Sequence, residues 1–359
     1  YEDRISINLI AYSQHVALGD DLYTALKTTP DSIRADGLFG STFGQITDNY
    51  TAPFNYRWVN ADGEEVSADT PDATMVGPYD SPIDLAWAEG QEVITNPSRC
   101  VLFEDDEYDT LTFDVNRVYT QVEHVDFYTT SYSFPDGYEP CASEDYHKTI
   151  LLSQDVEQLQ NAIDQFTPTL NTSIHRGAKW GASLLDPSMR DLIGGIPTVD
   201  DAFRGTRPAD YTDRTTSKYL VIMTDGLTVS SRRIKRDFYG DSVDYYNEFD
   251  EWKGMSEQSL YRYGQNDGNG STDYYNMSTT IGSETQLNEK LSQICDLAGD
   301  EVTEVYTISM GIQNATMTDC ASKEGNAFLS TITNDPDEPG LDEIFKSISD
   351  QITALRLSL

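Results

Sequence analysis

The chain has 359 residues, enough for one large domain or two modest ones, and its 38% hydrophobic content supports a packed core rather than global disorder. Its 61 acidic and 24 basic residues give a formal net charge of −37, which argues against nucleic-acid binding, because phosphate contacts need patches of Lys and Arg. The charge also disfavours docking on anionic membranes, and no apolar run approaches the roughly 20 residues of a transmembrane helix.

The chain begins with Tyr1 rather than Met and enters an apolar segment at once. Residues 4–12 (RISINLIAY) read as a buried strand. We expect further sequence upstream of Tyr1, where a signal peptide or membrane anchor would lie. Residues 20–147 show only short alternating pieces among Gly, Pro, Asp, Asn and Tyr, so we predict a long insertion of loops and small β elements.

Two amphipathic helices are predicted after this insertion. In residues 153–166 apolar side chains recur at helical spacing, at Val156, Leu159, Ala162, Ile163 and Phe166. In residues 173–185 (SIHRGAKWGASLL) the inner side is formed by Ile174, Ala178, Gly181, Leu184 and Leu185. Pro187 ends the second helix, and a polar stretch leads to an apolar strand at Tyr219–Thr224.

The last third of the chain starts with residues 228–282, a second irregular insertion that is acidic and rich in tyrosine. A helix is predicted over residues 283–299, where Ser283 and Gln286 fit a capping box and Gly299 suits the C-terminal cap. Its apolar stripe comprises Leu287, Leu291, Ile294 and Leu297. Residues 305–312 read as another strand, and residues 341–359 as a final amphipathic helix.

Apolar strands that alternate with amphipathic helices are typical of a parallel sheet covered on both faces. The predicted fold class is therefore α/β: a single domain over residues 1–359 with a doubly wound, mostly parallel sheet, helices on both faces and the two long irregular insertions. Ligands of such sheets bind beyond the carboxyl ends of the strands. Asp225, directly after the strand Tyr219–Thr224, lies at such an end.

The four cysteines, Cys100, Cys141, Cys295 and Cys320, have no zinc-type spacing, because there is no CxxC pair and the chain has only 4 His. Their even number in a Tyr-rich, Lys-poor chain favours two disulfides and an oxidising compartment. Of the three connectivities we favour the sequence-local one, Cys100–Cys141 with Cys295–Cys320. Four buried free thiols are the alternative.

The segments around Thr172 and Asp225 (LNTSIHRGAKWGASLL and YLVIMTDG) resemble the second and third metal-contacting segments of the von Willebrand factor type A domain. In that family a Thr and an Asp from these loops join an upstream Asp-x-Ser-x-Ser motif in holding Mg²⁺. The resemblance implies that Thr172 and Asp225 are two ligands of such a site, since Mg²⁺ prefers oxygen ligands. The simpler interpretation makes Thr172 a helix N-cap and Asp225 a turn residue.

The Asp-x-Ser-x-Ser motif itself is missing from these residues. The nearest string, residues 213–217 (DRTTS), precedes a strand, whereas the motif of the family follows one. We expect the motif upstream of Tyr1, together with the first strand and helix of the domain. The metal site would then be incomplete within this sequence, and a metal-free scaffold is the alternative.

Further segments narrow the resemblance: VALGDDLY, RCV, Trp180 within GAKWGASLLDP, SQICDL, TDCAS and the ending LDEIFKSISDQITALRLS. In this order they resemble TadG-type proteins, von Willebrand A-like components of the tight-adherence (Flp) pilus assembly system of bacteria. The match covers roughly residues 1–20, 148–227 and 283–359. Each segment is weak evidence alone, and the ordered set is more specific.

This resemblance implies a protein that is not an enzyme: a binding or assembly component in the periplasm or at the cell surface, anchored to the membrane by a segment upstream of Tyr1. Its partners would be proteins of the pilus or envelope, bound at the top of the sheet with or without Mg²⁺. A secreted or surface metal-dependent adhesin unrelated to pili is the alternative. A metal-assisted hydrolase is less favoured, because no G-x-S-x-G, P-loop or H-E-x-x-H motif occurs.

Three remaining features carry smaller expectations. Residues 267–273 (DGNGSTD) place oxygens at alternate positions but lack the distal Glu of a calcium loop, so we expect a flexible acidic loop. His175 has no accompanying nucleophile and is expected to be a surface or capping histidine. The tyrosine pairs at residues 245–246 and 274–275 would form either a contact surface or loop packing.

Overall fold

The centre of the protein is a three-stranded parallel sheet with the order β12–β11–β8. Its strands are β8 (Tyr219–Thr224), β11 (Glu304–Met310) and β12 (Ala327–Ser330). The computed structural model describes residues 4–28, 46–47, 57–59, 74–76, 99–114, 117, 119–122, 141–142, 144–167, 171–234, 278–301, 304–330 and 339–357.

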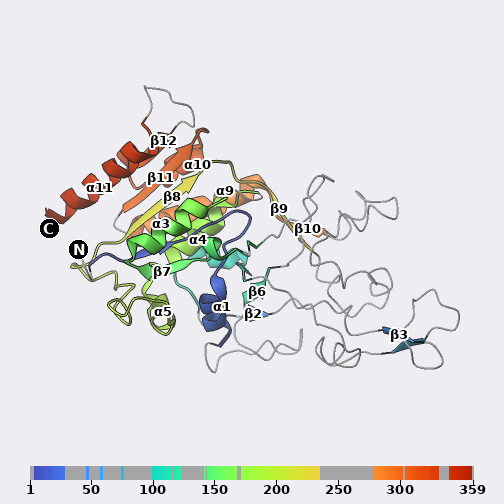
Figure 1. Cartoon of the computed structure of the whole chain (residues 1–359). Helices are drawn as coiled ribbons and strands as arrows, with labels where there is room; N and C mark the ends of the chain where they lie inside the picture. Colours follow the sequence, from blue (N-terminus) through green and yellow to red (C-terminus); the bar gives the residue numbers. More distant parts are fainter. Residues whose placement is uncertain are drawn as a thin grey trace.

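Helices pack on both faces of this sheet (Figure 1). On one face, Leu220 and Ile222 of β8 share a core cluster with residues of α4 (Ile174–Ser183) and α9 (Glu284–Glu301). On the other face, Tyr306 and Ile308 of β11 pack against Ile344 and Ile348 of α11 (Leu341–Leu357). The apolar run of β11 is explained by this double burial, whereas β8 is buried on one face only, and the mixed α/β class that the sequence predicts is confirmed.

A second, antiparallel sheet consists of β1 (Ile7–Leu9) and β7 (Ile150–Ser153). The strand predicted over residues 4–12 is therefore shorter than expected, and Tyr12 instead forms an isolated bridge with Val16. Helix α3 (Val156–Gln165) follows β7 and is capped by Asp155, whose side chain accepts from the Gln158 backbone N–H. Of the apolar residues at helical spacing in α3, Leu159 and Ala162 are buried, whereas Val156 and Ile163 are exposed.

The predicted insertion over residues 20–147 is more ordered at its ends than the sequence suggests. A helix, α1 (Gly19–Thr28), forms its first residues, where only loops and small β elements were expected. Leu22 and Leu26 of α1 are buried. Small β elements do occur: β2 (Ile46–Thr47), β5 (Val101–Leu102) and β6 (Tyr119–Gln121) form one sheet, and β3 (Arg57–Val59) pairs with β4 (Thr74–Val76).

An aromatic cluster joins residues 99–122 to the main core. Phe103 contacts Tyr108, Phe113, Tyr119 and Trp180 at centroid distances of 5.0 to 6.5 Å, and Trp180 belongs to α4. Because aromatic side chains bury large apolar areas, this part of the insertion folds as a layer of the domain. The 3₁₀ helix η2 (Asp105–Asp109) lies in this layer and contacts α9, to which Asp105 is linked by an ion pair with Lys290.

The remaining short elements connect these layers. They are η3 (Asp145–His147), η4 (Pro187–Met189), α5 (Arg190–Gly194), β9 (Ser231–Ile234), β10 (Ser278–Gly282), α10 (Ala315–Cys320) and η7 (Glu324–Asn326). Strands β9 and β10 pair antiparallel at the two ends of the acidic, tyrosine-rich insertion. No helix within the described ranges is long and apolar enough to span a membrane.

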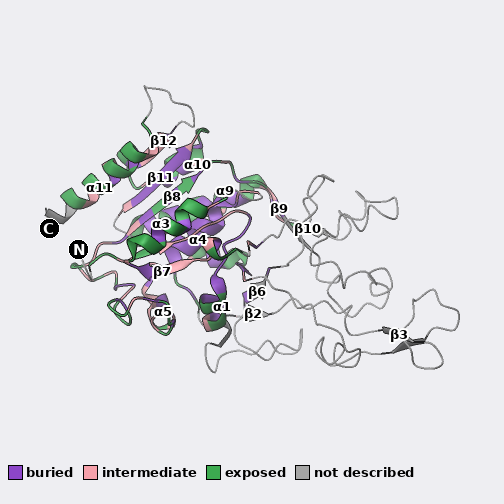
Figure 2. Ribbon diagram, viewed as in Figure 1, coloured by how far each residue is buried: buried purple, intermediate pink, exposed green. Residues whose placement is uncertain are grey.

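Burial follows the predicted stripe in α9, where Leu287, Leu291 and Ile294 are buried and Leu297 is half-buried (Figure 2). The predicted capping box of α9 is present: Gln286 accepts from the Ser283 backbone N–H at 3.0 Å, and Ser283 accepts from the Gln286 backbone N–H at 3.4 Å. Gly299 is not a C-terminal cap, since α9 continues through it to Glu301. In α11, Ile344 and Ile348 are buried, whereas Phe345 is exposed.

Candidate functional site

Two loops meet at the carboxyl end of β8. One is the turn that starts with Asp225, directly after Thr224, and the other precedes α4 and contains Thr172. The backbone N–H of Val229 donates to the carbonyl of Thr172 at 3.0 Å. A Cβ atom added to Gly226 would lie 3.0 Å from Thr172 Oγ1. The structure therefore places Thr172 beside the Asp225–Gly226 turn, at the same rim of the sheet.

A third loop, at residues 12–15, is bound to the first turn of α4. The backbone N–H of Ser173 donates to the carbonyl of Ser13 at 2.8 Å. The buried Arg176 guanidinium donates to the carbonyl of Gln14 at 2.5 Å and to Ser173 Oγ at 3.3 Å. Charged donors make strong hydrogen bonds to carbonyl oxygens when buried, so Arg176 fixes this loop against α4.

Tyr12 connects the third loop to β8. Its hydroxyl donates to the carbonyl of Met223 at 2.6 Å. Burial raises the pKa of the Tyr12 hydroxyl well above its ordinary value; a hydrogen bond with Thr224 lowers it, and the negative charge of Asp225 raises it again. Tyr12 therefore remains protonated at neutral pH and acts as a hydrogen-bond donor at the rim.

The Asp225 turn is held by its neighbour Thr224. Thr224 Oγ1 accepts from the Gly226 backbone N–H at 3.2 Å and contacts the Gly226 carbonyl at 3.1 Å. Asp225 itself is exposed, and within the described part of the chain no hydrogen bond or ion pair engages its carboxylate. The turn thus presents a carboxylate to solvent from a fixed backbone.

The oxygen atoms at this rim are of the type that Mg²⁺ prefers as ligands. They are the Thr172 hydroxyl, the Asp225 carboxylate and the nearby Thr228 hydroxyl, which is buried and has no hydrogen-bond partner among the residues that the structure describes. Mg²⁺ is usually held by one or two carboxylates together with hydroxyls and waters in an octahedron. No group of three or more His, Cys, Asp or Glu side chains that could hold a metal occurs among the residues described. The donor set at the rim therefore supplies only a fraction of the six positions.

The string at residues 213–217 takes no part in this rim. It leads into the amino end of β8, opposite the end at which Asp225 lies. Asp213 accepts from the Thr215 backbone N–H at 2.8 Å and from the Thr215 hydroxyl at 2.7 Å, which makes a local turn. The geometry agrees with the expectation that this string does not replace the Asp-x-Ser-x-Ser motif.

Two predictions about the start of α4 are wrong. The N-cap is Ser173 rather than Thr172, so the interpretation of Thr172 as a simple N-cap fails. His175 is neither a surface nor a capping residue: it is 1% exposed, and its ring lies 5.8 Å from that of Tyr108. Burial lowers its pKa well below the ordinary value, and Arg176 lowers it further. All ten residues of α4 are buried, a pattern that amphipathic spacing cannot reveal.

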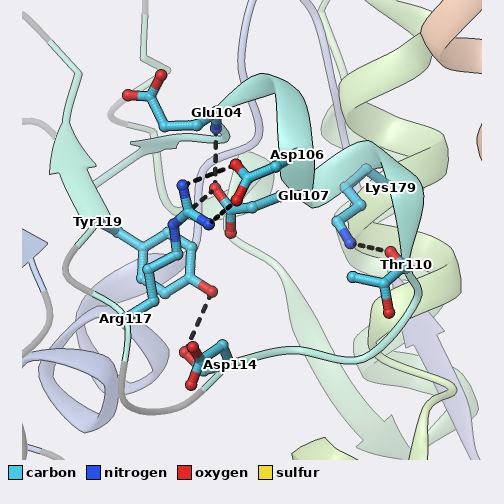
Figure 3. A network of polar contacts seen from close by, with 8 residues as sticks. All are labelled: Glu104, Asp106, Glu107, Thr110, Asp114, Arg117, Tyr119 and Lys179. Carbon is cyan, nitrogen blue, oxygen red and sulfur yellow. Dashed lines mark hydrogen bonds and ion pairs between the residues drawn. The ribbon is translucent and has the colours of Figure 1, made fainter.

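A polar network beside α4 positions the aromatic layer (Figure 3). Arg117 bonds both oxygens of Asp106, at 2.7 and 2.9 Å, and its Nε lies 3.4 Å from the buried carboxyl of Glu107. Lys179 of α4 donates to the carbonyl of Thr110 at 2.6 Å and lies over the Phe103 ring. Burial lowers the pKa of Lys179 to about 8 and raises that of Glu107. The Lys179 contacts attach Thr110 and Phe103 to α4, and the Arg117 contacts link residues within the aromatic layer.

Both disulfides have the pairing that the sequence favoured. Cys100 and Cys141 are bonded with a Cα–Cα distance of 5.7 Å, and Cys295 of α9 is bonded to Cys320 of α10 with a Cα–Cα distance of 5.0 Å. The alternative of four free thiols is therefore wrong for this structure. The acidic string at residues 267–273 and the tyrosine pairs at residues 245–246 and 274–275 lie outside the described residues.

Comparison with known proteins adds no relative: no family model, curated protein or solved structure matches the chain.

Proposed function

We propose that the protein is a binding component, not an enzyme, which contacts a partner protein through the rim at the carboxyl end of its parallel sheet. The observation that carries this proposal is the convergence of three loops at that rim, where the turn of the exposed Asp225 lies beside Thr172. Crevices beyond the carboxyl ends of strands are where α/β sheets bind their ligands.

Apolar side chains next to the carboxylate support contact with a protein. Leu227 and Val229 follow β8, and Ile312 follows β11; all three are exposed large hydrophobic residues at this end of the sheet. Exposed apolar residues mixed with a few polar groups are typical of protein interfaces. A metal-assisted hydrolase would need clustered ligands, and no group of three or more His, Cys, Asp or Glu side chains that could hold a metal occurs among the described residues.

We further propose that the domain is von Willebrand A-like and that Thr172 and Asp225 contribute to an Mg²⁺ site there. The remaining ligands would come from the Asp-x-Ser-x-Ser motif that we expect upstream of Tyr1. Bound Mg²⁺ would supply an open coordination position that a carboxylate of the partner can occupy. Within this chain, the Thr224 and Gly226 contacts would orient Asp225, and Gly226 leaves room for the Thr172 hydroxyl.

The partner class rests on the resemblance to TadG-type proteins: we propose an extracytoplasmic component of a tight-adherence pilus system, anchored to the membrane by an upstream segment. The two disulfides support this location, because disulfides persist in oxidising compartments. A surface adhesin unrelated to pili would share the rim and differ only in its partner.

The magnesium part of the proposal is tested by thermal denaturation of the natural protein with and without millimolar MgCl₂. We expect Mg²⁺ to raise Tm, because a ligand that binds only the folded state stabilises it. Asp225→Asn should abolish this gain, whereas the control Asp213→Asn, at the opposite end of β8, should retain it. The absence of a response in the wild-type protein would contradict a magnesium site.

The binding part is tested by affinity capture from envelope fractions of bacteria that carry tight-adherence pili. Pilus-assembly proteins should be retained by the wild type and by Asp213→Asn, and lost with the rim variants Leu227→Asp and Asp225→Asn. Equal capture by the rim variants would show that the rim is not the contact surface. Capture of envelope proteins other than pilus components would favour the adhesin alternative.

A further inference from the structure

One hydroxyl holds both polar backbone groups of Gly226, the residue that follows the exposed Asp225. Thr224 Oγ1 accepts a hydrogen bond from the Gly226 backbone N–H at 3.2 Å and donates one to the Gly226 carbonyl at 3.1 Å. A threonine hydroxyl that bonds the N–H two residues ahead forms a local turn. Thr224 is buried and Asp225 is exposed, so a buried side chain at the end of β8 fixes a turn that faces solvent.

The position after Asp225 favours glycine for a steric reason. A Cβ atom added to Gly226 would lie 3.0 Å from Thr172 Oγ1 and 3.7 Å from Thr172 Cβ. The shorter distance is closer than ordinary van der Waals contact, so a larger residue would push against the loop before α4. The approach of Thr172 to the turn therefore explains why the chain keeps an Asp–Gly pair here.

An Asp–Gly pair has a covalent chemistry of its own. The glycine nitrogen can attack the aspartate Cγ and close a five-membered succinimide ring. The new N–C bond replaces a Cγ–O bond, and the released oxygen leaves as water with the nitrogen's proton and one proton from solvent. Because glycine has no Cβ, no side chain shields the attacking nitrogen.

Water then opens the succinimide at either of its two carbonyl groups. Attack at Cγ restores aspartate. Attack at the former backbone carbonyl leaves the main chain running through Cγ, and the product is isoaspartate. Water is the only co-reactant, so the rearrangement needs no oxidant, reductant or enzyme.

The two bonds of Thr224 oppose this reaction in the folded protein. The succinimide nitrogen carries no hydrogen, so the bond from the Gly226 N–H to Thr224 Oγ1 must be lost before the ring closes. The turn is also held further along, where the Val229 N–H donates to the Thr172 carbonyl at 3.0 Å. Cyclisation then requires local opening of the turn, and its rate follows the population of the open form.

We propose that the Asp225–Gly226 peptide is a site of spontaneous isoaspartate formation, and that the Thr224 hydroxyl sets how fast it forms in the folded protein. Isoaspartate adds one atom to the main chain at the rim and leaves the free carboxylate on the Asp225 Cα atom. The modification requires no metal or partner, so the proposal does not rest on the function proposed for the rim.

The test follows isoaspartate in the folded chain at neutral pH and physiological temperature, with a chelator to exclude any metal bound by Asp225. Trypsin releases residues 219–232 as one peptide, whose isoaspartyl form separates by chromatography and is identified by electron-transfer fragmentation. Thr224→Val removes the hydroxyl and should raise the rate at Asp225 by about two- to tenfold, the range that the net contribution of one hydrogen bond predicts.

Two variants separate the hydroxyl from the general rigidity of the rim. Thr224→Ser keeps the hydroxyl and should form isoaspartate within about twofold of the wild-type rate. Tyr12→Phe removes the bond to the Met223 carbonyl but leaves Gly226 both of its bonds, and should also stay within about twofold.

The chain unfolded in urea supplies the upper limit of the rate. There Asp225 should react at least about tenfold faster than in the folded wild type, because all bonds of the turn are lost. Its rate should match those of the other Asp–Gly pairs in the same sample, at residues 36–37, 62–63, 136–137 and 267–268.

Four results would overturn the proposal. An unchanged rate in Thr224→Val would show that the hydroxyl does not protect the turn. Equal acceleration in Tyr12→Phe would assign the protection to the rim as a whole. Folded wild-type protein that converts as fast as the unfolded chain would have no protection. A Thr224→Val protein that forms no isoaspartate while the unfolded chain converts would show that Asp225 is not a modification site.

Discussion

His15 and His175 occupy positions in the core, where they are 4% and 1% exposed. Burial lowers the pKa of both rings well below the ordinary value, and the nearby Arg176 charge lowers it further. In the unfolded chain both rings take up a proton as the pH falls through about 6.5, whereas in the folded protein they stay neutral. The unfolded state then binds more protons, so stability is lost as the pH falls below that value.

We predict that the free energy of unfolding decreases between pH 7.5 and pH 5.5, by up to about 1.4 kcal/mol per pH unit for each histidine. The double variant His15→Gln, His175→Gln should show a flatter dependence, and each single variant an intermediate one. Urea denaturation at several pH values measures this. A double variant with the wild-type slope would show that the two rings do not set the pH dependence.

Glu107 is a buried carboxyl whose cationic neighbour is Arg117 (Figure 3). Arg117→Leu should lower the free energy of unfolding by about 2 to 3 kcal/mol, because it leaves Glu107 buried without its cation. The control Lys346→Leu breaks an exposed pair with Asp350, 3.9 Å long, and should change stability by less than about 0.5 kcal/mol. Equal losses in urea denaturation would mean that the Arg117 contact contributes no more than a surface pair.

At the scale of elements, α4 packs against both the loop of Tyr12 and strand β8, which form the rim. Its glycines contact Tyr12 and Leu220, so a side chain at Gly177 would displace the Tyr12 ring and its bond to Met223. Gly177→Ala should lower stability by about 1 to 3 kcal/mol. Gly299→Ala, within α9 and with no atom within 4 Å of the added methyl, should raise it by about 0.5 to 1 kcal/mol. Thermal melts compare the two, and a stabilising Gly177→Ala would contradict the packing argument.

The sequence predicts best those elements whose residue pattern depends on local sequence rather than on distant contacts. The bounds of β8 agree with the prediction because its run of apolar, partly β-branched residues favours a strand, and the capping box of α9 is a local signal. Helix α1 was missed because a helix of 10 residues is stabilised by tertiary burial of Leu22 and Leu26 more than by its own sequence.

Part of the candidate site could be predicted from the sequence, and part of it could not. The resemblance to the von Willebrand factor type A domain pairs Thr172 with Asp225, and the structure places Thr172 beside the Asp225–Gly226 turn. The loop of Tyr12 could not be predicted, since its place depends on bonds to Met223 and Ser173 far along the chain. Nor could the burial of Lys179, which is tolerated because its ammonium group finds the Thr110 carbonyl and the Phe103 ring.

At the scale of the whole molecule, the two disulfides join segments that are separated along the chain. Cys295–Cys320 links α9 to α10 over a separation of 25 residues, and Cys100–Cys141 spans 41 residues. Replacing either pair by Ala should lower the free energy of unfolding by about 3 to 4 kcal/mol, mainly through the unfolded chain's entropy. Urea denaturation of each double variant, with the reduced wild-type protein as reference, measures this. Unchanged stability would contradict a structural role.

The complete burial of α4 has a consequence for sequence variation. In a library of all single substitutions selected for folding, α11 should tolerate changes at most positions other than those of Ile344 and Ile348, because it packs on one side only. Variants of α4 should instead be depleted at each of its ten positions, since none faces solvent. Divergence within a lineage of such proteins would then accumulate in the long insertions, while the stretch from Ile174 to Ser183 would drift least.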